Sequence, residues 1–410
     1  MENFILKNNV KIVFNKTSGA DVVALRVVTS VSVVNEILNN AGISYITSKL
    51  MIRSTKNRSN EILINDIENI GAQLYAFTDY DISGFCMTFT SEYFNKAVEI
   101  LSDVVLNPTL DDKNLFFEKQ KVIAILKSRK DNIGDVAYDE FIKLFYYKTP
   151  YAVPVFGTNI SVKKISRENV KHWYEYSYNS SNILISVSGN INKNVVKKSL
   201  EKYFSLVPDG MKSKKSAFNN VQHYKPIKKE IDGKFDQSYI YMGFQAPSIF
   251  DLDFIPMKIA NTILGGKMSS RLFIELRENF GLAYEVGSIY PPRVEGSYFA
   301  IYVGLDKKNI DLVLDKIYEI LKNFCVTEIS DRELKDAKIY IKSLYAMERQ
   351  TVNKQSYYYG WREIIGQGYE YDTEYLNDVN KISTKDILNI TNKIFSKYPV
   401  TIIINSQIED

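Results

Sequence analysis

The stretch Lys-Ile-Ser-Arg-Glu-Asn-Val at residues 164–170 is echoed by Lys-Ile-Ser-Thr-Lys-Asp-Ile at residues 381–387, an offset of 217 residues. A second pair keeps the same order, with Asp-Lys-Asn-Leu at 112–115 and Asp-Arg-Glu-Leu at 331–334, an offset of 219 residues. Two matches at nearly one offset indicate a duplicated unit of about two hundred residues, because solenoid repeats have periods of only roughly 20–50 residues. The pattern therefore predicts two related domains in tandem.

The seam between the two domains is expected in residues 207–230. The segment Val-Pro-Asp-Gly-Met-Lys-Ser-Lys-Lys-Ser at its start is polar, turn-forming and basic, which is typical of a linker. We therefore predict an N-terminal domain at 1–208, a linker at 209–230 and a C-terminal domain at 231–410. The 410 residues also exceed the roughly 100–200 residues of an ordinary single domain.

Within the first unit, predicted strands and helices come in adjacent groups. β-rich runs at 4–14, broken by a hairpin at Asn8-Asn9, and at 22–33 precede helical patterns at 41–53 and 59–70. A strand pair at 72–78 and 82–90 follows, and then two helices at 91–106 and 112–130, which Asn107-Pro108 separates. This grouping favours an α+β fold of two tandem homologous domains, each a largely antiparallel sheet covered by helices, over a doubly wound parallel sheet.

Composition excludes several classes of protein. The 52 basic and 48 acidic residues leave a formal net charge of +4, so no strong field favours nucleic acid or an anionic membrane as a partner. Two cysteines exclude a disulfide scaffold and a cysteine-based zinc ribbon. No apolar run approaches the roughly 20 residues of a membrane span, and the first residues do not resemble a signal peptide. We expect a soluble, cytoplasmic protein.

Three features have ordinary explanations. The segment Gly-Gly-Lys-Met-Ser-Ser at 265–270 lacks the spacing of a phosphate-binding loop, so its glycines are better read as a tight connection into a helix at 271–279. His172 lies in an aromatic helical stretch, where a packed or partly exposed histidine is the usual outcome. His223 lies in the linker region and is expected at the surface. Neither histidine suggests a catalytic triad.

Two further motifs carry a family resemblance. Leu-Gly-Gly-Lys-Met-Ser-Ser-Arg-Leu at 264–272 and Arg-Glu-Asn-Phe-Gly-Leu-Ala-Tyr at 277–284 resemble the L-G-G-G-M-S-S-R-L and R-E-x-x-G-L-A-Y signatures of insulinase/pitrilysin-type (inverzincin) zinc metallopeptidases. Residues 70–78 are similar to the I-G-G-x-x-N-A-x-T stretch of that family, with Tyr75 in place of the asparagine, and residues 329–344 resemble its late helix. The resemblance covers essentially the whole chain. It implies the duplicated fold of the short two-domain kind related to mitochondrial processing peptidase.

The resemblance also shows what this chain lacks. In the peptidases of the family, a helix of the first domain carries H-x-x-E-H: the histidines bind zinc, the glutamate activates the bound water, and a later glutamate completes the metal site. The same frame, begun at Gly42, places Tyr45 and Lys49 in the histidine slots and Ser48 in the glutamate slot. The later ligand position falls at Leu126. The resemblance therefore implies that this chain binds no metal, and that zinc belongs to a partner chain.

The second domain keeps the pair of residues that the family uses to hold substrate. Arg277 and Tyr284, behind Gly265 and Gly266, resemble the arginine and tyrosine that hydrogen-bond the substrate backbone and stabilise the oxyanion of the tetrahedral intermediate. The ordinary alternative is an exposed charge on a helix and a tyrosine that only packs at the start of a strand. The spacing of seven residues behind the Gly-rich segment favours the functional interpretation.

Lost metal ligands with a retained Arg/Tyr pair suggest a division of labour between two chains. The leading hypothesis is a non-catalytic, substrate-binding subunit of a heterodimeric zinc metallopeptidase. Its partner would be a homologous H-x-x-E-H-bearing chain and its ligand an unfolded peptide. The alternative is a catalytically inactive peptide-binding or scaffold homologue that acts without a peptidase partner. The peptide sequence that is preferred, and the oligomeric state of the chain alone, are not encoded in any linear motif.

Overall fold

The computed structural model describes residues 1–213, 223 and 225–407. The chain divides into two compact units: unit 1 contains Met1–Lys127, Val153–Ser216 and Ala346–Thr373, and unit 2 contains Ser128–Ala152, Ala217–Tyr345 and Glu374–Asp410. Within the expected linker 209–230, residues 214–222 and 224 lie outside the described residues. Both units are α+β, with a mostly antiparallel sheet covered by helices, which confirms the predicted fold class.

Unit 1 is built on a six-stranded sheet with the order β1-β2-β6-β3-β5-β4. The strand pair β2–β6 is parallel and the other described pairs are antiparallel. Asn9 adopts a φ of 67° in the turn between β1 and β2, which confirms the hairpin predicted at Asn8-Asn9. The strands are β1 (Glu2–Ile5), β2 (Lys11–Lys16), β3 (Val22–Thr29), β4 (Gln73–Thr78), β5 (Ser83–Thr90) and β6 (Ile183–Gly189).

The helices of unit 1 begin and end where local chemistry predicts. Ser59 caps α2 by accepting the backbone N–H of Ile62, and α3 ends at Leu106, just before Pro108. The helices are α1 (Ile43–Met51), α2 (Asn60–Glu68), α3 (Phe94–Leu106), α4 (Asp112–Arg129), α6 (Asn159–Lys164), α7 (Arg167–Ser177), α8 (Lys193–Phe204) and α13 (Val352–Ile365), with the 3-10 turns η1 (Val33–Asn35), η2 (Leu38–Asn40) and η3 (Ser91–Tyr93).

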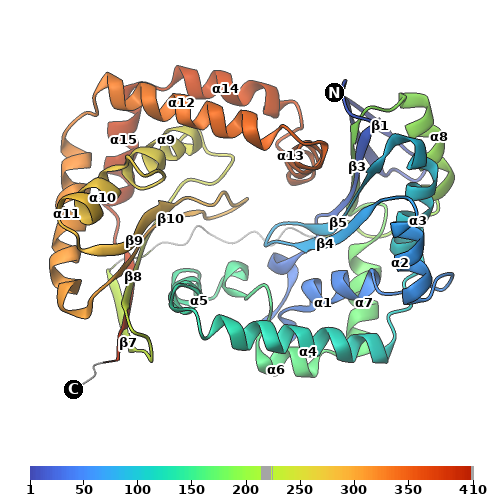
Figure 1. Ribbon diagram of the computed structural model, residues 1–410, viewed down its shortest axis with the longest axis horizontal. Helices are drawn as coiled ribbons and strands as arrows, with labels where there is room; N and C mark the ends of the chain where they lie inside the picture. Colours follow the sequence, from blue (N-terminus) through green and yellow to red (C-terminus); the bar gives the residue numbers. More distant parts are fainter. Residues whose placement is uncertain (214–222, 224, 408–410) are drawn as a thin grey trace. The chain divides into compact units, whose positions relative to one another are not determined.

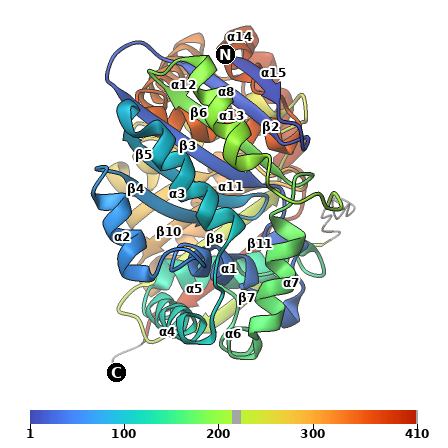
Figure 2. The same ribbon diagram turned by 90° about the vertical axis from the view of Figure 1, so that its right-hand side faces the viewer.

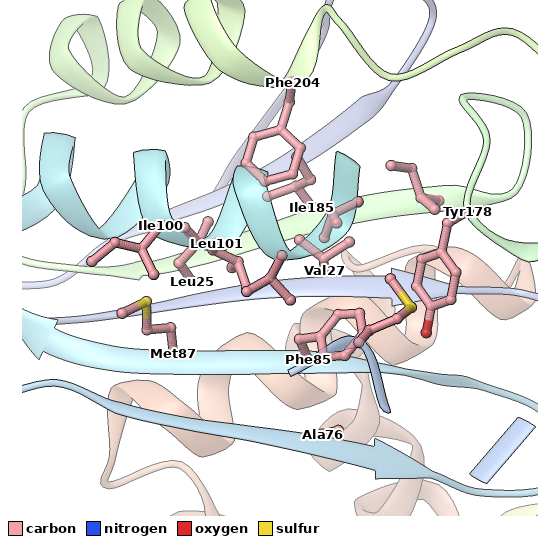
Figure 3. Packing of buried hydrophobic residues seen from close by; sticks show 14 of the residues in the cluster. Leu25, Val27, Ala76, Phe85, Met87, Ile100, Leu101, Tyr178, Ile185 and Phe204 are labelled. Atoms are coloured by element: carbon pink, nitrogen blue, oxygen red, sulfur yellow. The ribbon is translucent and has the colours of Figure 1, made fainter. Parts of the chain in front are cut away.

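The main core of unit 1 lies between the sheet and one helical layer. Helices α2, α3 and α8 lie over one face of the sheet (Figures 1 and 2). Leu25 and Val27 of β3 point from this face toward Ile100 and Leu101 of α3 (Figure 3), and all four side chains are buried. Because side chains alternate along a strand, the residues between them face the opposite side of the sheet, where α13 packs on β3 and β6.

Unit 2 is built on a five-stranded sheet with the order β7-β11-β8-β10-β9, in which only the described pair β7–β11 is parallel. Its strands are β7 (Ile227–Asp232), β8 (Ser238–Gln245), β9 (Ala283–Ile289), β10 (Tyr298–Leu305) and β11 (Val400–Asn405). Its helical segments are η4 (Pro150–Ala152), α5 (Ile133–Phe145), α9 (Phe254–Leu264), α10 (Arg271–Phe273), the π-helix η5 (Ile274–Asn279), η6 (Lys307–Asn309), α11 (Ile310–Val326), α12 (Asp331–Glu348), α14 (Tyr371–Lys381), which begins in unit 1, and α15 (Thr384–Phe395).

The duplicated motifs form equivalent local structures. Lys119 of α4 donates through Nζ to two backbone carbonyls at the end of α6, and Lys338 of α12 does the same at the end of α14. Ser166 and Ser383 then cap α7 and α15 by accepting a backbone N–H of the first turn. The echoed stretches therefore belong to two copies of one structural motif. In each copy, a lysine satisfies the backbone carbonyls at the end of one helix, and a serine caps the next helix.

One helix from each half of the sequence packs in the other unit. α5, which follows α4, packs on β8 and β11 of unit 2, whereas α13, which follows α12, packs in unit 1. A Cβ atom at Gly243 of β8 would lie 2.3 Å from the ring of Phe141 of α5, so glycine is required for this close contact. A Cβ atom at Gly360 of α13 would lie 3.0 Å from the Ser186 side chain. Nothing in the duplicated motifs predicts this exchange of equivalent helices.

Candidate functional site

Helix α1 presents the three residues that stand in the first metal slots. Gly42, with a φ of 91°, precedes the helix in a left-handed conformation that favours glycine. The ring of Tyr45 packs edge-on against Phe156 at 5.0 Å between centroids, and the Ser48 hydroxyl donates to the carbonyl of Tyr45, 2.9 Å away. The Ser48 hydroxyl also lies 3.1 Å from the Thr78 hydroxyl. These side chains are engaged in packing and local hydrogen bonds.

Lys49 has a role of its own at the edge of the sheet. Its Nζ donates to the backbone carbonyl of Ala76 in edge strand β4 at 2.9 Å, and the ammonium lies 5.4 Å from the centre of the Tyr45 ring. Burial lowers the pKa of Lys49, and the nearby Glu118 carboxylate partly opposes this shift. An unpaired edge strand exposes backbone groups to other chains, and a charged side chain is a common way to protect it. Lys49 therefore caps one edge carbonyl of β4.

Glu118 was not predicted as a site residue from the sequence. This carboxylate on α4 is 3% exposed, accepts a hydrogen bond from Arg53 Nε at 2.6 Å, and faces Lys49 and Tyr45 of α1. Helical spacing could have predicted that Glu118 is buried, because Leu115, Glu118 and Val122 lie on one face of α4 and are its buried residues. A buried acid in such a stripe needs a cationic partner, which α1 and the residues after it supply.

The four slots do not fit a zinc ion. Leu126 packs against the hydrophobic core of unit 1 and has no donor atom, and Lys49 brings a positive charge to the place of an imidazole. In the described part of the chain, no group of three His, Cys, Asp or Glu side chains is arranged to hold a metal ion.

The two histidines differ in exposure. His172 is exposed on α7. The ring of His223 is partly buried, and its centroid lies 5.2 Å from that of the Phe145 ring, so the expectation of a surface histidine at 223 is wrong.

The Gly-rich segment of unit 2 joins α9 closely to edge strand β9. A Cβ atom at Gly265 would lie 2.5 Å from the backbone nitrogen of Ser288, which donates to the Gly265 carbonyl at 3.1 Å. A Cβ atom at Gly266 would lie 3.0 Å from Thr262 of α9. The glycines therefore allow close backbone packing, as the tight-connection interpretation predicts.

Arg277 and Tyr284 meet at the start of β9. Arg277 Nη1 donates to the Tyr284 carbonyl at 2.9 Å, and the Tyr284 hydroxyl donates to Asp306 Oδ1 at 2.8 Å. Both side chains are exposed, Tyr284 to 57%. The hydrogen bond to Asp306 raises the pKa of Tyr284. The sequence analysis did not identify Asp306, which lies just beyond the end of β10 and has no motif of its own.

The helix before Tyr284 differs from the expected one. Residues 271–279 form one turn of α-helix, α10, followed by the π-helix η5, instead of a regular α-helix. Arg277 lies in η5, and its guanidinium carbon lies 5.3 Å from the centre of the Phe273 ring. π-helical turns are rare and are frequent at functional sites. Arg277 and Tyr284 lie in unit 2, whereas Tyr45, Ser48, Lys49 and Leu126 lie in unit 1.

Comparisons with known proteins agree with this architecture. Residues 11–159 match the family described as Insulinase (Peptidase family M16), and residues 164–340 match the Peptidase M16 inactive domain. The chain is 25% identical over 400 residues to an uncharacterized zinc protease of Rickettsia bellii, with 97% of this chain and 96% of that protein covered. It is 22% identical over 387 residues to the mitochondrial-processing peptidase subunit beta of Saccharomyces cerevisiae, with 90% and 83% covered.

Solved structures show the same fold. A peptidase M16 inactive domain from Pseudomonas fluorescens matches with a TM-score of 0.92 at 18% identity, over 99% of this chain and 98% of that chain. A chain of Complex III2 from Candida albicans matches with a TM-score of 0.83 at 14% identity, over 98% and 95%.

A duplicated α+β fold with this Gly-rich segment and Arg/Tyr pair defines a metallopeptidase-like protein. The chain belongs to the insulinase family, peptidase family M16. No helix in the described residues combines the length and the apolar character that crossing a membrane requires.

Proposed function

We propose that this chain is the non-catalytic, substrate-binding subunit of a heterodimeric zinc metallopeptidase, whose zinc is bound by an H-x-x-E-H-bearing partner chain. The observation that carries the proposal is the contrast between the two motifs. The metal slots hold Tyr45, Ser48, Lys49 and Leu126, engaged in packing and local bonds, while Arg277 and Tyr284 remain exposed. The similarity to a protein named as one subunit of a processing peptidase supports a peptidase partner.

Arg277 and Tyr284 have the chemistry to hold a peptide in trans. The Arg277 guanidinium is permanently charged, and its bond to the Tyr284 carbonyl uses only part of its fork of donors. The Tyr284 phenol exchanges its bond to Asp306 for a bond to a developing oxyanion. β9 is an edge strand, and an extended peptide can also pair with those of its backbone groups that Gly265 and Arg277 do not engage.

The test uses this chain with and without a homologous H-x-x-E-H chain from the same genome. The chain alone is expected to contain no zinc by metal analysis and to cleave no peptide. The mixture is expected to cleave peptides, and Tyr284→Phe is expected to lower kcat/KM about 100-fold because one oxyanion donor is lost. Tyr318→Phe is the matched control, since Tyr318 is a comparably exposed tyrosine on α11 of the same unit.

Two results would contradict the proposal. Full activity of the partner alone would show that this chain is not needed for catalysis. Peptide binding by this chain, together with no activity alongside any H-x-x-E-H chain of the genome, would instead favour the alternative, an inactive peptide-binding or scaffold homologue. The fold shared with a chain of Complex III2 makes that alternative the second candidate.

A further inference from the structure

A row of polar side chains crosses the sheet of unit 1 at one register. Ser186 of β6, Arg26 of β3, Cys86 of β5 and Tyr75 of β4 are paired in sequence across four neighbouring strands. Arg26 lies between Leu25 and Val27, which point into the core (Figure 3), so its side chain faces the opposite side, toward α13. The row therefore lies between the sheet and α13.

Arg26 is surrounded by hydrogen-bonding groups that carry no charge. Its Nη2 donates to the Tyr75 hydroxyl at 3.1 Å and to the side-chain oxygen of Asn353 at 3.0 Å, and its Nε lies 3.5 Å from the Ser356 hydroxyl. Nη2 also lies 3.3 Å from the Asn353 carbonyl. Asn353 joins the row from α13, because its amide nitrogen donates to Thr88 at 3.1 Å. Nη1 makes no hydrogen bond to any described residue.

This arginine is buried without a counter-charge. Arg26 is 2% exposed, and within the described residues no Asp or Glu forms an ion pair with it. In the same unit, the buried Arg362 and the partly buried Arg58 each pair with a carboxylate. The rings of Phe77 and Tyr357 lie 4.9 and 5.3 Å from the guanidinium carbon and offset part of its charge. A buried charge without an ionic partner is costly, and a bound anion would lower that cost.

The first turn of α13 adds to the positive potential. α13 has 14 residues and begins at Val352, with Thr351 as its cap, so Asn353 lies in the first turn, where the helix dipole is positive. A ligand has a route to this place because Tyr75 is 39% exposed. The hydrogen bond from its hydroxyl to Asn353, 2.9 Å long, also lies in an exposed environment. The Tyr75 hydroxyl therefore joins the surface to the buried guanidinium.

We propose that Arg26, Tyr75 and the first turn of α13 form a binding site for a carboxylate of a peptide ligand. The carboxylate accepts one hydrogen bond from the Tyr75 hydroxyl, which leaves Asn353, and one from Arg26 Nη1, while Nη2 keeps its bond to Asn353. That the ligand is a peptide rests on the proposed function, whereas the anion site rests on the burial and contacts of Arg26. A C-terminal carboxylate and an Asp or Glu side chain offer the same chemistry.

The test measures peptide binding to the full-length chain without a partner, by fluorescence anisotropy. Three labelled peptides share one sequence: the first has a free C-terminal carboxylate and no acidic residue, the second has an amidated C-terminus and one Glu, and the third is amidated without acid. At least one carboxylate peptide is expected to bind about tenfold more tightly than the third, and the tighter of the two identifies the source of the carboxylate. Equal affinity of all three peptides would overturn the proposal.

Variants separate a binding role of Arg26 from a structural one. Arg26→Met is expected to abolish the tenfold preference and to leave the thermal midpoint unchanged or raised, because it removes an unpaired buried charge. Arg58→Met is the matched control: it removes an arginine with three carboxylate partners and is expected to lower the midpoint while the preference remains. An equal loss of stability in both variants, with the preference retained by Arg26→Met, would overturn the proposal.

Tyr75→Phe keeps the experiment decisive if Arg26→Met does not fold. Its hydroxyl is at the exposed end of the site, so the variant is expected to fold and to lose most of the carboxylate preference. An unchanged preference in Tyr75→Phe would overturn the assigned geometry. Failure of the heterodimer to cleave peptides would leave this result intact, because no partner chain or catalysis enters the binding measurement.

Discussion

The edge strands β4 of unit 1 and β9 of unit 2 are each protected by a cationic side chain, but the two cations have different surroundings. In each, a cation from a neighbouring helix donates to an edge carbonyl at 2.9 Å, Lys49 to Ala76 and Arg277 to Tyr284. Lys49 is partly buried, its pKa is lowered by burial, and a buried carboxylate faces it. Arg277 is exposed and keeps further donors free. The comparison indicates that the cation of unit 1 is part of the packing, whereas the cation of unit 2 is exposed to solvent, as the proposed function requires.

The largest expected effect separates the two cations in a heterodimer with an H-x-x-E-H partner. Arg277→Ala is expected to lower kcat/KM about 100-fold, because it removes the charged donor that the proposed function assigns to substrate binding. Lys49→Ala is expected to stay within about threefold of the unmodified subunit, provided that circular dichroism shows an intact fold. Equal losses in the two variants would remove the functional distinction between the edges.

A second effect concerns the start of α1, where Glu36 accepts the backbone N–H groups of Gly42 and Ser44 at 2.7 and 2.8 Å. Burial raises the pKa of Glu36 to about 7 from an ordinary value of 4.5. Below the unfolded-state pKa of 4.5, Glu36 is protonated in both the folded and the unfolded chain, and its contribution to stability is fully present. This contribution is lost as the pH rises through about 7, because the buried carboxyl must then ionise. The free energy of unfolding should therefore fall by about 2 kcal/mol from this group between pH 5 and 8.

The measurement is urea unfolding of the unmodified chain and of Glu36→Gln at both pH values. The variant is expected to lose this part of the pH dependence, while Glu275→Gln, a change at a partly exposed carboxylate of η5 in unit 2, should keep it. A decline that is identical in Glu36→Gln would show that other groups cause it.

The smallest expected effect compares the carboxylates beside the two edges. Glu118→Gln is expected to lower the free energy of unfolding by about 1.5 kcal/mol, because the guanidinium of Arg53 loses its charged acceptor at a buried position. Asp306→Asn, beside the exposed Tyr284, is expected to change it by less than about 0.5 kcal/mol. Both values come from denaturant midpoints at neutral pH, and a larger loss in Asp306→Asn would show that the edge of unit 2 is structural as well.

Much of the local structure follows from patterns within a few residues. The hairpin at Asn9, the cap at Ser59 and the end of α3 before Pro108 each depend on a residue and its near neighbours. The helix expected at 271–279 shows the limit, because residues 274–279 form the π-helix η5, in which the backbone N–H of Phe280 donates to the carbonyl of Glu275. The partly buried ring of His223 is a second case, since its neighbour Phe145 lies on a helix far earlier in the chain.

The sequence alone determined the duplication, the α+β class, the family resemblance and the identity of the residues in the metal slots, because each is a property of residue type and spacing. Only the tertiary structure decided that α5 and α13 pack in the opposite units, that Lys49 caps Ala76, and that Arg26 is buried with neutral partners. These features join residues as far apart as β3 and α13, and long-range contacts of this kind depend on how whole faces of sheets and helices are buried, which no local pattern records.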